Sequence, residues 1–424
     1  MTVVTLNVNG LAVGGECIAQ VTAGEQQLIG KKALIRNVIP GEEVSAEILK
    51  DSPRLLHAKL IETTRSSPHR VTPPCPYFED CGGCDYQHIE VPFQRSEKLR
   101  MVEQMLRFQS KLHSAAGVRL IGEALSAQNY RSRVSFQLDE DGAIGFFGRG
   151  TREVVSIDRC LLANSMINQT LERIRNAVPG IGADASSMTV ETESVQNTVY
   201  VLVHLREDAT RSEIADVAWF QTLVTCVPNL SILFRKTLIY CQERSQERSL
   251  PSRPIGHFSQ VNPDGNEHLI KLVSQYVTSE EVTDLYAGAG NFSIPLARSG
   301  KKKVEAVDFD RALTQYGNSR AKRLGLSKQL SFTRANCADY VRNKSLLSTV
   351  VLDPPRSGAK QVVKFIKPEK VKRVIYVSCS LPTLARDLKT LVGNGYELSS
   401  VDLIDMFTHT HHVETVSVLE SKAP

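Results

Sequence analysis

The stretch EVTDLYAGAGNFS, residues 281–293, decides the fold of the C-terminal part of the chain. It begins as an apolar run typical of a buried strand and continues into a turn that holds Gly288 and Gly290. Glycines between a strand and a helix let the backbone approach a ligand and expose helix N–H groups to it. Strand and helix patterns alternate from about residue 256 onward, which predicts a Rossmann-like α/β domain over residues 256–424.

The same stretch indicates the kind of ligand. Its turn reads G-x-G-N and lacks the full G-x-G-x-x-G fingerprint of dinucleotide sites. Asp308 stands 18 residues past Gly290, at the end of the next strand-like run, where an acidic side chain can bind the hydroxyl pair of a ribose. We therefore expect a nucleoside-bearing cofactor without a pyrophosphate, S-adenosylmethionine, in preference to NAD.

A cysteine closes a later apolar run. Residues 374–377, VIYV, are followed by Ser378 and Cys379, and the carboxyl ends of strands in open α/β sheets line the ligand crevice. The pattern also fits a buried core thiol, the usual state of a free cysteine. Two motifs accompany Cys379 and favour the functional interpretation, DPPR at residues 353–356 and HVET at residues 412–415.

Three further cysteines lie within ten residues, in the spacing C-x5-C-x2-C, at Cys75, Cys81 and Cys84. Thiolates grouped this tightly suit a metal centre. Zinc sites usually supply two close pairs, whereas here the next cysteine is the distant Cys160. Three close ligands and one remote one favour an iron–sulfur cluster. Zinc and unligated thiols are the alternatives, and the isolated Cys226 and Cys241 are expected in the core.

Upstream of residue 256 the chain divides in two by composition. Residues 1–62 hold short apolar runs between glycine and proline turns, which predicts a small β-barrel that binds RNA or merely caps the protein. Residues 63–255 predict a central α+β domain, which begins with a proline-rich linker at 65–74. Within it we expect an amphipathic helix over 93–108, strands at 134–138 and 199–203, and a helix over 165–177.

Composition sets further bounds. The chain has 424 residues, a hydrophobic fraction of 42% and a charged fraction of 23%, which are values of a globular multidomain protein. It has neither a membrane-spanning apolar run nor a secretory signal, so a cytoplasmic location is expected. The net charge of +5 permits a nucleic-acid partner. Basic runs at 298–328 and 360–373 fit either solvated helix faces or phosphate contacts.

In this order, the motifs resemble those of RNA uridine-5-methyltransferases. The resemblance rests on the four cysteines, the loop of residues 284–291, DPPR, Ser378-Cys379 and HHVET at residues 411–415, and it covers nearly the whole chain. It points to the cluster-bearing branch that methylates C5 of uridine in 23S ribosomal RNA. This implies a class I S-adenosylmethionine-dependent fold, a [4Fe-4S] cluster, an N-terminal RNA-binding (TRAM) barrel and RNA as the partner of a monomer.

The resemblance also implies a role for each matching residue. Cys379 matches the nucleophile that attacks C6 of uracil, and Glu414 matches the base that removes the C5 proton. The residues that match the cofactor site are Gln260, Tyr286, Asn291, Asp308, Asn336 and Asp353, and those that match the cluster ligands are Cys75, Cys81, Cys84 and Cys160. The chain departs from the family at Ser380 and Leu381, where asparagine and proline are usual, and at Asp308, where glutamate is usual.

Other functions fit parts of the pattern. Some archaeal tRNA uridine-54 methyltransferases carry both barrel and cluster, and RNA cytosine-5-methyltransferases also use a cysteine. Arg356 stands where amino-methyltransferases place an aromatic residue, which argues against N-methylation. Radical S-adenosylmethionine enzymes need C-x3-C-x2-C, and the first gap here is five residues. A non-catalytic RNA-binding protein, with Cys379 in its core and Glu414 on its surface, is the remaining alternative.

Overall fold

The computed structural model describes residues 2–422 except 108–116, 179, 194–196, 208–209, 236 and 244–255. The chain forms two compact units. The larger consists of Met1–Thr72, His88–Leu125 and Asp264–Pro424, and the smaller of Pro73–Gln87 and Ser126–Pro263. The division into functional domains at residues 62 and 255 stays a prediction.

The N-terminal strands close into a barrel, as predicted. Its order is β1-β2-β3-β5-β4, and its strands are β1 Val3–Leu11, β2 Cys17–Ala23, β3 Lys32–Ile35, β4 Glu43–Ser52 and β5 Leu55–Arg65. Buried and exposed side chains alternate along β1, so every second residue fills the interior. Closure leaves no free edge that could pair with another chain.

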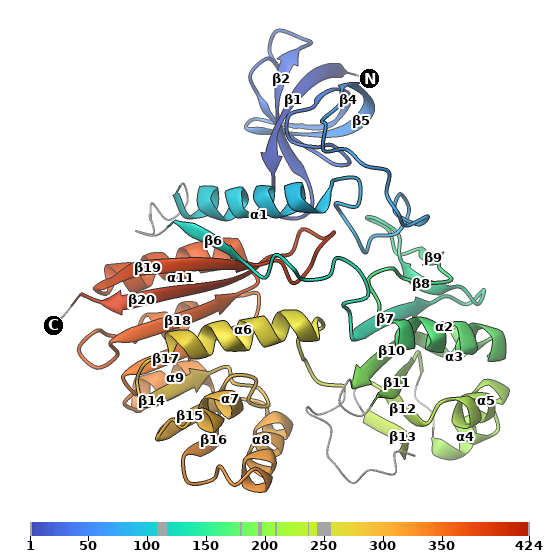
Figure 1. Ribbon diagram of the computed structural model, residues 1–424. Helices are drawn as coiled ribbons and strands as arrows, with labels where there is room; N and C mark the ends of the chain where they lie inside the picture. The colour runs from blue at the N-terminus through green and yellow to red at the C-terminus, as the bar shows by residue number, and fades with distance from the viewer. Residues whose placement is uncertain are drawn as a thin grey trace. The chain divides into compact units, whose positions relative to one another are not determined.

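The second sheet of the larger unit is doubly wound. Among the described residues it has the order β16-β15-β14-β17-β18-β20-β19-β6, visible in Figure 1. The first five strands are parallel, and β20 is antiparallel to β18. Their bounds are β14 Glu281–Leu285, β15 Lys303–Asp308, β16 Leu330–Arg334, β17 Thr349–Leu352, β18 Arg373–Ser378, β19 Tyr396–Ile404, β20 Glu414–Ser421 and β6 Val118–Ile121.

Helices connect the parallel strands, as a right-handed crossover requires. They are α6 Pro263–Tyr276, α7 Ser293–Arg298, α8 Arg311–Arg323, α9 Cys337–Asn343, α10 Lys360–Val363 and α11 Leu381–Gly393, and α1 Val91–Met105 precedes the sheet. Strands β14, β17 and β18 are buried almost throughout, because helices cover both faces of such sheets. The Rossmann-like prediction is confirmed. Helix α1 begins two residues before the predicted start, and Phe108 lies outside the described residues.

The smaller unit is built on a sheet with the order β13-β12-β11-β10-β7-β8-β9. Its elements are β7 Arg133–Leu138, β8 Ile144–Phe147, β9 Val154–Ser156, α2 Ser165–Ala177, α3 Ile181–Asp184, β10 Ala185–Glu193, β11 Thr198–Leu205, α4 Arg211–Ala215, α5 Ala218–Cys226, β12 Asn229–Phe234 and β13 Thr237–Glu243. The predicted helix over 165–177 is confirmed. Helices α2 and α5 pack their apolar side chains against the sheet. The core prediction for Cys241 is wrong, because β13 is an edge strand and leaves the thiol exposed.

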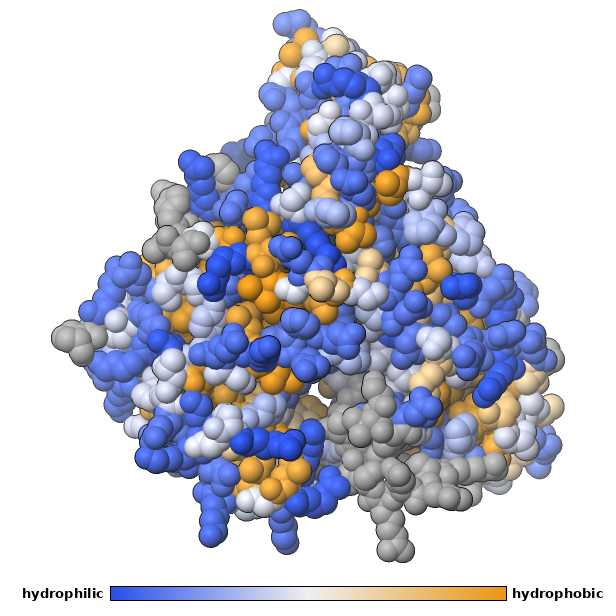
Figure 2. All heavy atoms as spheres, viewed as in Figure 1, coloured by the Kyte–Doolittle hydropathy of each residue, from blue (hydrophilic) through white to orange (hydrophobic). Residues whose placement is uncertain are grey.

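Hydrophilic residues cover most of the face in Figure 2, with apolar residues in smaller areas between them. Among the described helices, none is both long and apolar enough to cross a lipid bilayer.

Candidate active site

The sequence-predicted residues gather where the doubly wound sheet changes direction. From β14 the chain proceeds outward through β15 and β16 and then returns to β17 and β18 on the other side. The crevice at the carboxyl ends of two such strands is the usual ligand site of open α/β sheets. Tyr286 follows β14 and Asp353 follows β17, and the Asp353 N–H donates to the Leu285 carbonyl at 3.4 Å.

The glycine turn after β14 takes a backbone path that needs its glycines. Gly290 has a φ of +95°, and a Cβ there would stand 2.7 Å from the Phe332 ring. The Gly288 N–H donates to Asp308 Oδ2 at 2.9 Å, and the Asp310 N–H donates to Asp308 Oδ1 at 2.8 Å. Asp308 is thereby fixed beside the turn at the end of β15, as the sequence predicted.

Asp284 is a site residue that sequence reasoning missed. It lies within β14, is fully buried and accepts a hydrogen bond from the Ser293 hydroxyl. Burial raises the pKa of Asp284 to about 7, and the charge of Asp308 raises it further against the effect of Ser293. An acidic residue inside an apolar strand was the available signal. Asp284 thus adds a second carboxyl group, besides that of Asp308, near the glycine turn after β14.

Two predicted asparagines are held by other groups. Asn291 and Asn266 of α6 form a reciprocal amide pair, with N–O distances of 2.9 and 3.0 Å. Asn336 caps α9, and its side chain accepts from the Ala338 N–H at 2.9 Å. Both positions flank the same edge of the sheet, because they follow β14 and β16 in the chain.

Cys379 and Glu414 lie at neighbouring ends of the paired strands β18 and β20. Strand β18 pairs with β20 so that Ser378 lies opposite Thr415, and the Thr415 hydroxyl donates to the Ser378 carbonyl at 3.1 Å. Cys379 and Glu414 are the next residues beyond this last pair, and the charge of Glu414 acts on the Cys379 thiol. Glu414 is only 2% exposed, which excludes a surface carboxylate.

The charges around Cys379 are mostly negative. Burial raises its pKa to about 11, the charges of Glu414 and Asp353 raise it further, and the Arg356 guanidinium opposes them. Burial and the charge of Asp353 hold the pKa of Glu414 well above its usual range. Burial raises the pKa of Asp353 to about 7, with a further increase from Asp284. The site therefore rests with a protonated thiol among carboxyl groups that shift one another.

A buried network fixes the loop between Asp353 and Ala359. The Ala359 N–H donates to Asp387 Oδ2 at 2.7 Å, and the Tyr376 hydroxyl donates to the same oxygen at 2.8 Å. Gly358 has a φ of +75°, and a Cβ there would meet Asp387 Oδ2 at 2.6 Å. The Arg356 guanidinium in this loop lies 3.5 Å from His412 Nε2. The loop is thus positioned from α11 and from the segment before Glu414.

The four remaining predicted cysteines come together in the smaller unit. Burial raises the pKa of the Cys84 thiol to about 12, while Gln87 opposes this increase and the charges of Cys160 and Cys81 add to it. Burial also raises the pKa values of Cys75 and Cys81, and the charge of Cys160 contributes to both. The Gly83 N–H donates to Cys81 Sγ at 3.4 Å. No group of three or more His, Cys, Asp or Glu side chains within the described ranges could hold a metal ion.

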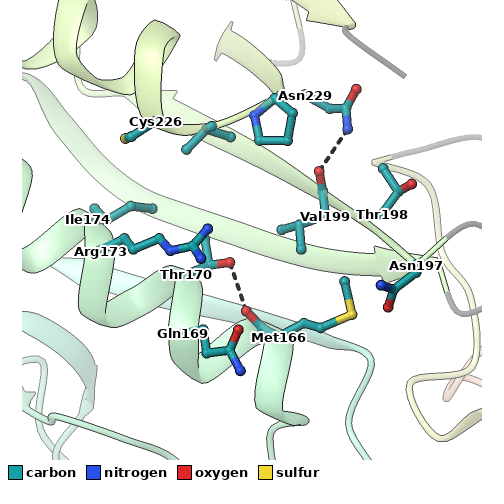
Figure 3. A pocket seen from close by; sticks show the side chains of 12 residues that line it. Met166, Gln169, Thr170, Arg173, Ile174, Asn197, Thr198, Val199, Cys226 and Asn229 are labelled. Carbon is teal, nitrogen blue, oxygen red and sulfur yellow. Dashed lines mark hydrogen bonds between the residues drawn. The ribbon is translucent and has the colours of Figure 1, made fainter. Parts of the chain in front are cut away.

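The smaller unit also contains a cavity of about 350 Å³ between α2, β11 and the segment after α5. Figure 3 shows Arg173, Gln169 and Asn197 around it. None of the predicted site residues lines this cavity.

Gln260, the sixth predicted cofactor residue, also belongs to the smaller unit and follows the exposed Phe258. Its role stays a prediction, whereas the other five lie at the edge described above.

A family model described as tRNA (Uracil-5-)-methyltransferase matches residues 97–422, most of the chain. The chain belongs to this family. It is a methyltransferase, and the resemblance noted in its motifs is confirmed.

Relatives agree with this membership, and a solved structure shares the fold. A protein of Pectobacterium atrosepticum named 23S rRNA (uracil(1939)-C(5))-methyltransferase RlmD is 30% identical over 92% of this chain and 89% of its own length. A protein of the same name from Neisseria lactamica is 30% identical over 94% and 92%. The structure of Pyrococcus abyssi tRNA (uracil-54, C5)-methyltransferase with S-adenosyl-L-homocysteine superposes with a TM-score of 0.73 at 22% identity, covering 98% of this chain and 99% of that one. This last likeness concerns the fold alone.

Proposed function

We propose that this methyltransferase transfers a methyl group from S-adenosylmethionine to C5 of a uridine in 23S ribosomal RNA. The observation that supports the proposal most is the pairing of Ser378 with Thr415, which leaves Cys379 and the buried Glu414 as the next residues beyond this pair, with the charge of Glu414 acting on the thiol. Uracil C5 methylation needs a nucleophile and a base on the two ends of one double bond, and Cys379 and Glu414 offer both. The names of the bacterial relatives support ribosomal RNA as the substrate.

In the proposed reaction the Cys379 thiolate adds to C6 of uracil, which makes C5 nucleophilic. S-adenosylmethionine supplies the methyl group, which passes from its sulfonium to C5 and leaves S-adenosylhomocysteine. Glu414 then removes the proton from C5, the C5–C6 double bond re-forms and the bond between C6 and Cys379 Sγ breaks. A base inside an RNA stack cannot reach both groups, so we expect the target uridine to be flipped out.

The remaining predicted residues would hold the methyl donor. Asp308, fixed at the glycine turn, has the position for the ribose hydroxyls, and Gly288 and Gly290 let the backbone approach. Asp353 would fix either the uracil edge or the donor. The other residues assigned here are Gln260, Tyr286, Asn291 and Asn336.

The smaller unit would hold a [4Fe-4S] cluster on Cys75, Cys81, Cys84 and Cys160. Mutual repulsion among four thiolates is relieved when iron binds them, and the interacting charges of these four support that assignment. The alternative is a single zinc ion, which would require the four cysteine sulfurs to lie close together, because each Zn–S bond is about 2.3 Å. In a [4Fe-4S] cluster each cysteine binds a different iron atom, so the sulfurs can lie farther apart. We assign the cluster a structural or RNA-contacting role and expect it not to be redox-active in methyl transfer, because its ligands lie far in sequence from Cys379. A change in the chemical step on oxidation or reduction of the intact cluster would contradict this role.

The closed barrel over residues 1–62 would bind RNA, with 63–255 as the central domain and 256–424 as the methyltransferase domain. Barrels of this size present a face to oligonucleotides. Proteins that lack the barrel should keep the chemistry and lose affinity for RNA.

The test is mass spectrometry of ribosomal and transfer RNA from a deletion strain, complemented with wild type or Cys379→Ala. Loss of 5-methyluridine at one ribosomal site, restored only by the wild type, is expected. Loss in tRNA alone would favour the second candidate, tRNA methylation, which the description of the matching family supports. Loss of 5-methylcytidine would identify a cytosine enzyme. No change in any of these bases would leave only a binding role.

A further inference from the structure

Helix α1 contacts the loop that leads to Glu414. This loop, residues 405–413, joins β19 to β20 and is largely buried. Hairpin loops usually have two to five residues, and a longer buried one must find partners for its backbone polar groups. Gln94 and Lys98 of α1 bond to backbone groups of the loop, and Arg95 and Lys98 bond to the side chain of Asp405.

The centre of this contact is a buried ion pair. Lys98 is 0% exposed and Asp405 is 1% exposed, and Lys98 Nζ donates to Asp405 Oδ1 at 2.7 Å. The same ammonium group donates to the Phe407 carbonyl at 3.1 Å. Arg95 Nε donates to Asp405 Oδ2 at 3.2 Å, and the Thr408 hydroxyl donates to that oxygen at 2.8 Å.

Gln94 holds the middle of the loop. Its Oε1 accepts from the His409 N–H at 2.9 Å, and its Nε2 lies 3.0 Å from His409 Nδ1. His409 has a φ of +69°, a left-handed conformation that costs energy in a residue other than glycine. The hydrogen bonds from α1 therefore help to maintain a strained path five residues before Glu414.

We propose that Lys98, supported by Gln94 and Arg95, is a positioning residue for Glu414. The inference rests on the proposed function, because it assigns these residues to the step in which Glu414 removes the C5 proton. Lys98 does not touch the reacting atoms. It fixes Asp405 and Phe407, and the loop between them and β20 sets where Glu414 begins its strand near Cys379. A displacement of a catalytic group by about 1 Å lowers a rate about 10²-fold.

The proposal predicts which intermediate accumulates. If Glu414 is displaced, Cys379 still adds to C6 and methyl transfer still occurs, but removal of the C5 proton and release of the thiol slow down. A covalent complex of protein and methylated RNA should then build up. A merely destabilised enzyme would instead form less of this complex.

The experiment uses the full-length protein with S-adenosylmethionine and an RNA transcript that contains the methylated site. Adduct is measured as the fraction of protein that migrates with RNA under denaturing conditions, together with kcat and KM. The Lys98→Met variant keeps the length of the side chain and removes its donors. We expect kcat to fall about 10- to 100-fold, the adduct to rise at least about fivefold over wild type, and KM for S-adenosylmethionine to change less than about twofold.

Two further variants keep the test independent of folding. The Gln94→Met variant removes the bonds to His409 and leaves no buried charge, and we expect it to accumulate adduct as well. The Arg119→Met variant is the matched control. Arg119 of β6 pairs at 2.8 Å with Asp402, a buried carboxylate of β19 that precedes the 405–413 loop. It should lower the melting temperature without raising the adduct.

Each outcome separates the two proposals. No methylation by the wild type would contradict the proposed function itself. Turnover by the wild type and adduct with Glu414→Gln, but none with Lys98→Met or Gln94→Met, would overturn the positioning role alone. Full turnover in a Lys98→Met, Asp405→Asn double variant would also overturn it, because Lys98 would then only balance a charge.

Discussion

Burial raises the thiol pKa most at both cysteine sites of this chain, but the charged groups that raise it further differ between them. Cys379 is a single thiol with two carboxyl groups, Glu414 and Asp353, that raise its pKa. Cys84 has a similarly raised pKa, but apart from burial the groups that raise it are other thiols, Cys160 and Cys81. Besides burial, the groups that oppose ionisation of the first thiol are ones to which we assign roles in the proposed reaction. The second is kept from ionising by partners that would bind the same cluster.

This difference is consistent with the two roles we propose, a nucleophile at Cys379 and a cluster ligand at Cys84. A metal centre relieves the electrostatic repulsion among neighbouring thiolates, because it binds all of them at once. The proposed site gives Cys379 no such shared metal centre. Cys379 must ionise transiently, with Arg356 as the cation that favours its thiolate form. The comparison predicts different consequences when each kind of thiol is replaced.

The largest effect is expected for Cys379→Ser. A hydroxyl is a much weaker nucleophile than a thiolate at neutral pH, so methylation should fall by at least about 10⁴-fold. The melting temperature should change by less than about 3 °C, because the two side chains are nearly the same size. Rates are measured by transfer of labelled methyl groups to RNA. Cys241→Ser is the control, since Cys241 is exposed on an edge strand and its replacement should leave the rate unchanged.

The sequence predicted the residues of the candidate active site whose positions follow from the ends of strands. Asp308, the glycine turn and Cys379 lie at the ends of apolar runs, and parallel strands bring such ends to one edge. The buried state of Glu414 could not be predicted this way, because it depends on the register between β18 and β20.

Lys98 was harder still to recognise. It lies among the charged residues of an amphipathic helix, and its partner Asp405 is 307 residues away in the chain. No periodicity in the sequence distinguishes such a buried lysine from a solvated one.

A smaller effect on activity is expected when a cluster ligand is replaced. If the proposed cluster assignment holds, the wild type should bind iron and sulfide, and Cys84→Ser should lose both and lower the melting temperature by at least about 5 °C, because metal binding contributes to folding. The folded fraction should keep kcat within about threefold, since these thiols have no part in the proposed chemical step. Iron and sulfide analysis measures the cluster content, calorimetry the melting temperature, and active-site titration the folded fraction to which kcat refers.

Cys226→Ser, at a half-buried cysteine of the same unit, controls for general destabilisation. Retention of iron by Cys84→Ser, or a loss of kcat as large as that of Cys379→Ser, would erase the distinction between the two sites.

The smallest effect concerns the reactivity of Cys379 itself. The Glu414 carboxylate raises the pKa of this thiol and the Arg356 guanidinium lowers it, so Glu414→Gln should lower the pKa and Arg356→Met should raise it. Below pH 11 a shift of one pKa unit changes the thiolate fraction about tenfold, and about half of that change in log rate is offset by altered nucleophilicity. Alkylation by iodoacetamide, followed for the Cys379 peptide by mass spectrometry, should therefore be about threefold faster in Glu414→Gln and about threefold slower in Arg356→Met. The effect of Glu414→Gln should grow as the pH rises, because the wild-type carboxyl group, whose pKa burial and Asp353 raise, then loses its proton. Alkylation of Cys84 in the same samples should not change, because neither residue contributes to the pKa of that thiol. Equal rates at Cys379 in all three proteins would mean that its neighbours do not control its ionisation, and the electrostatic contrast between the two sites would be lost.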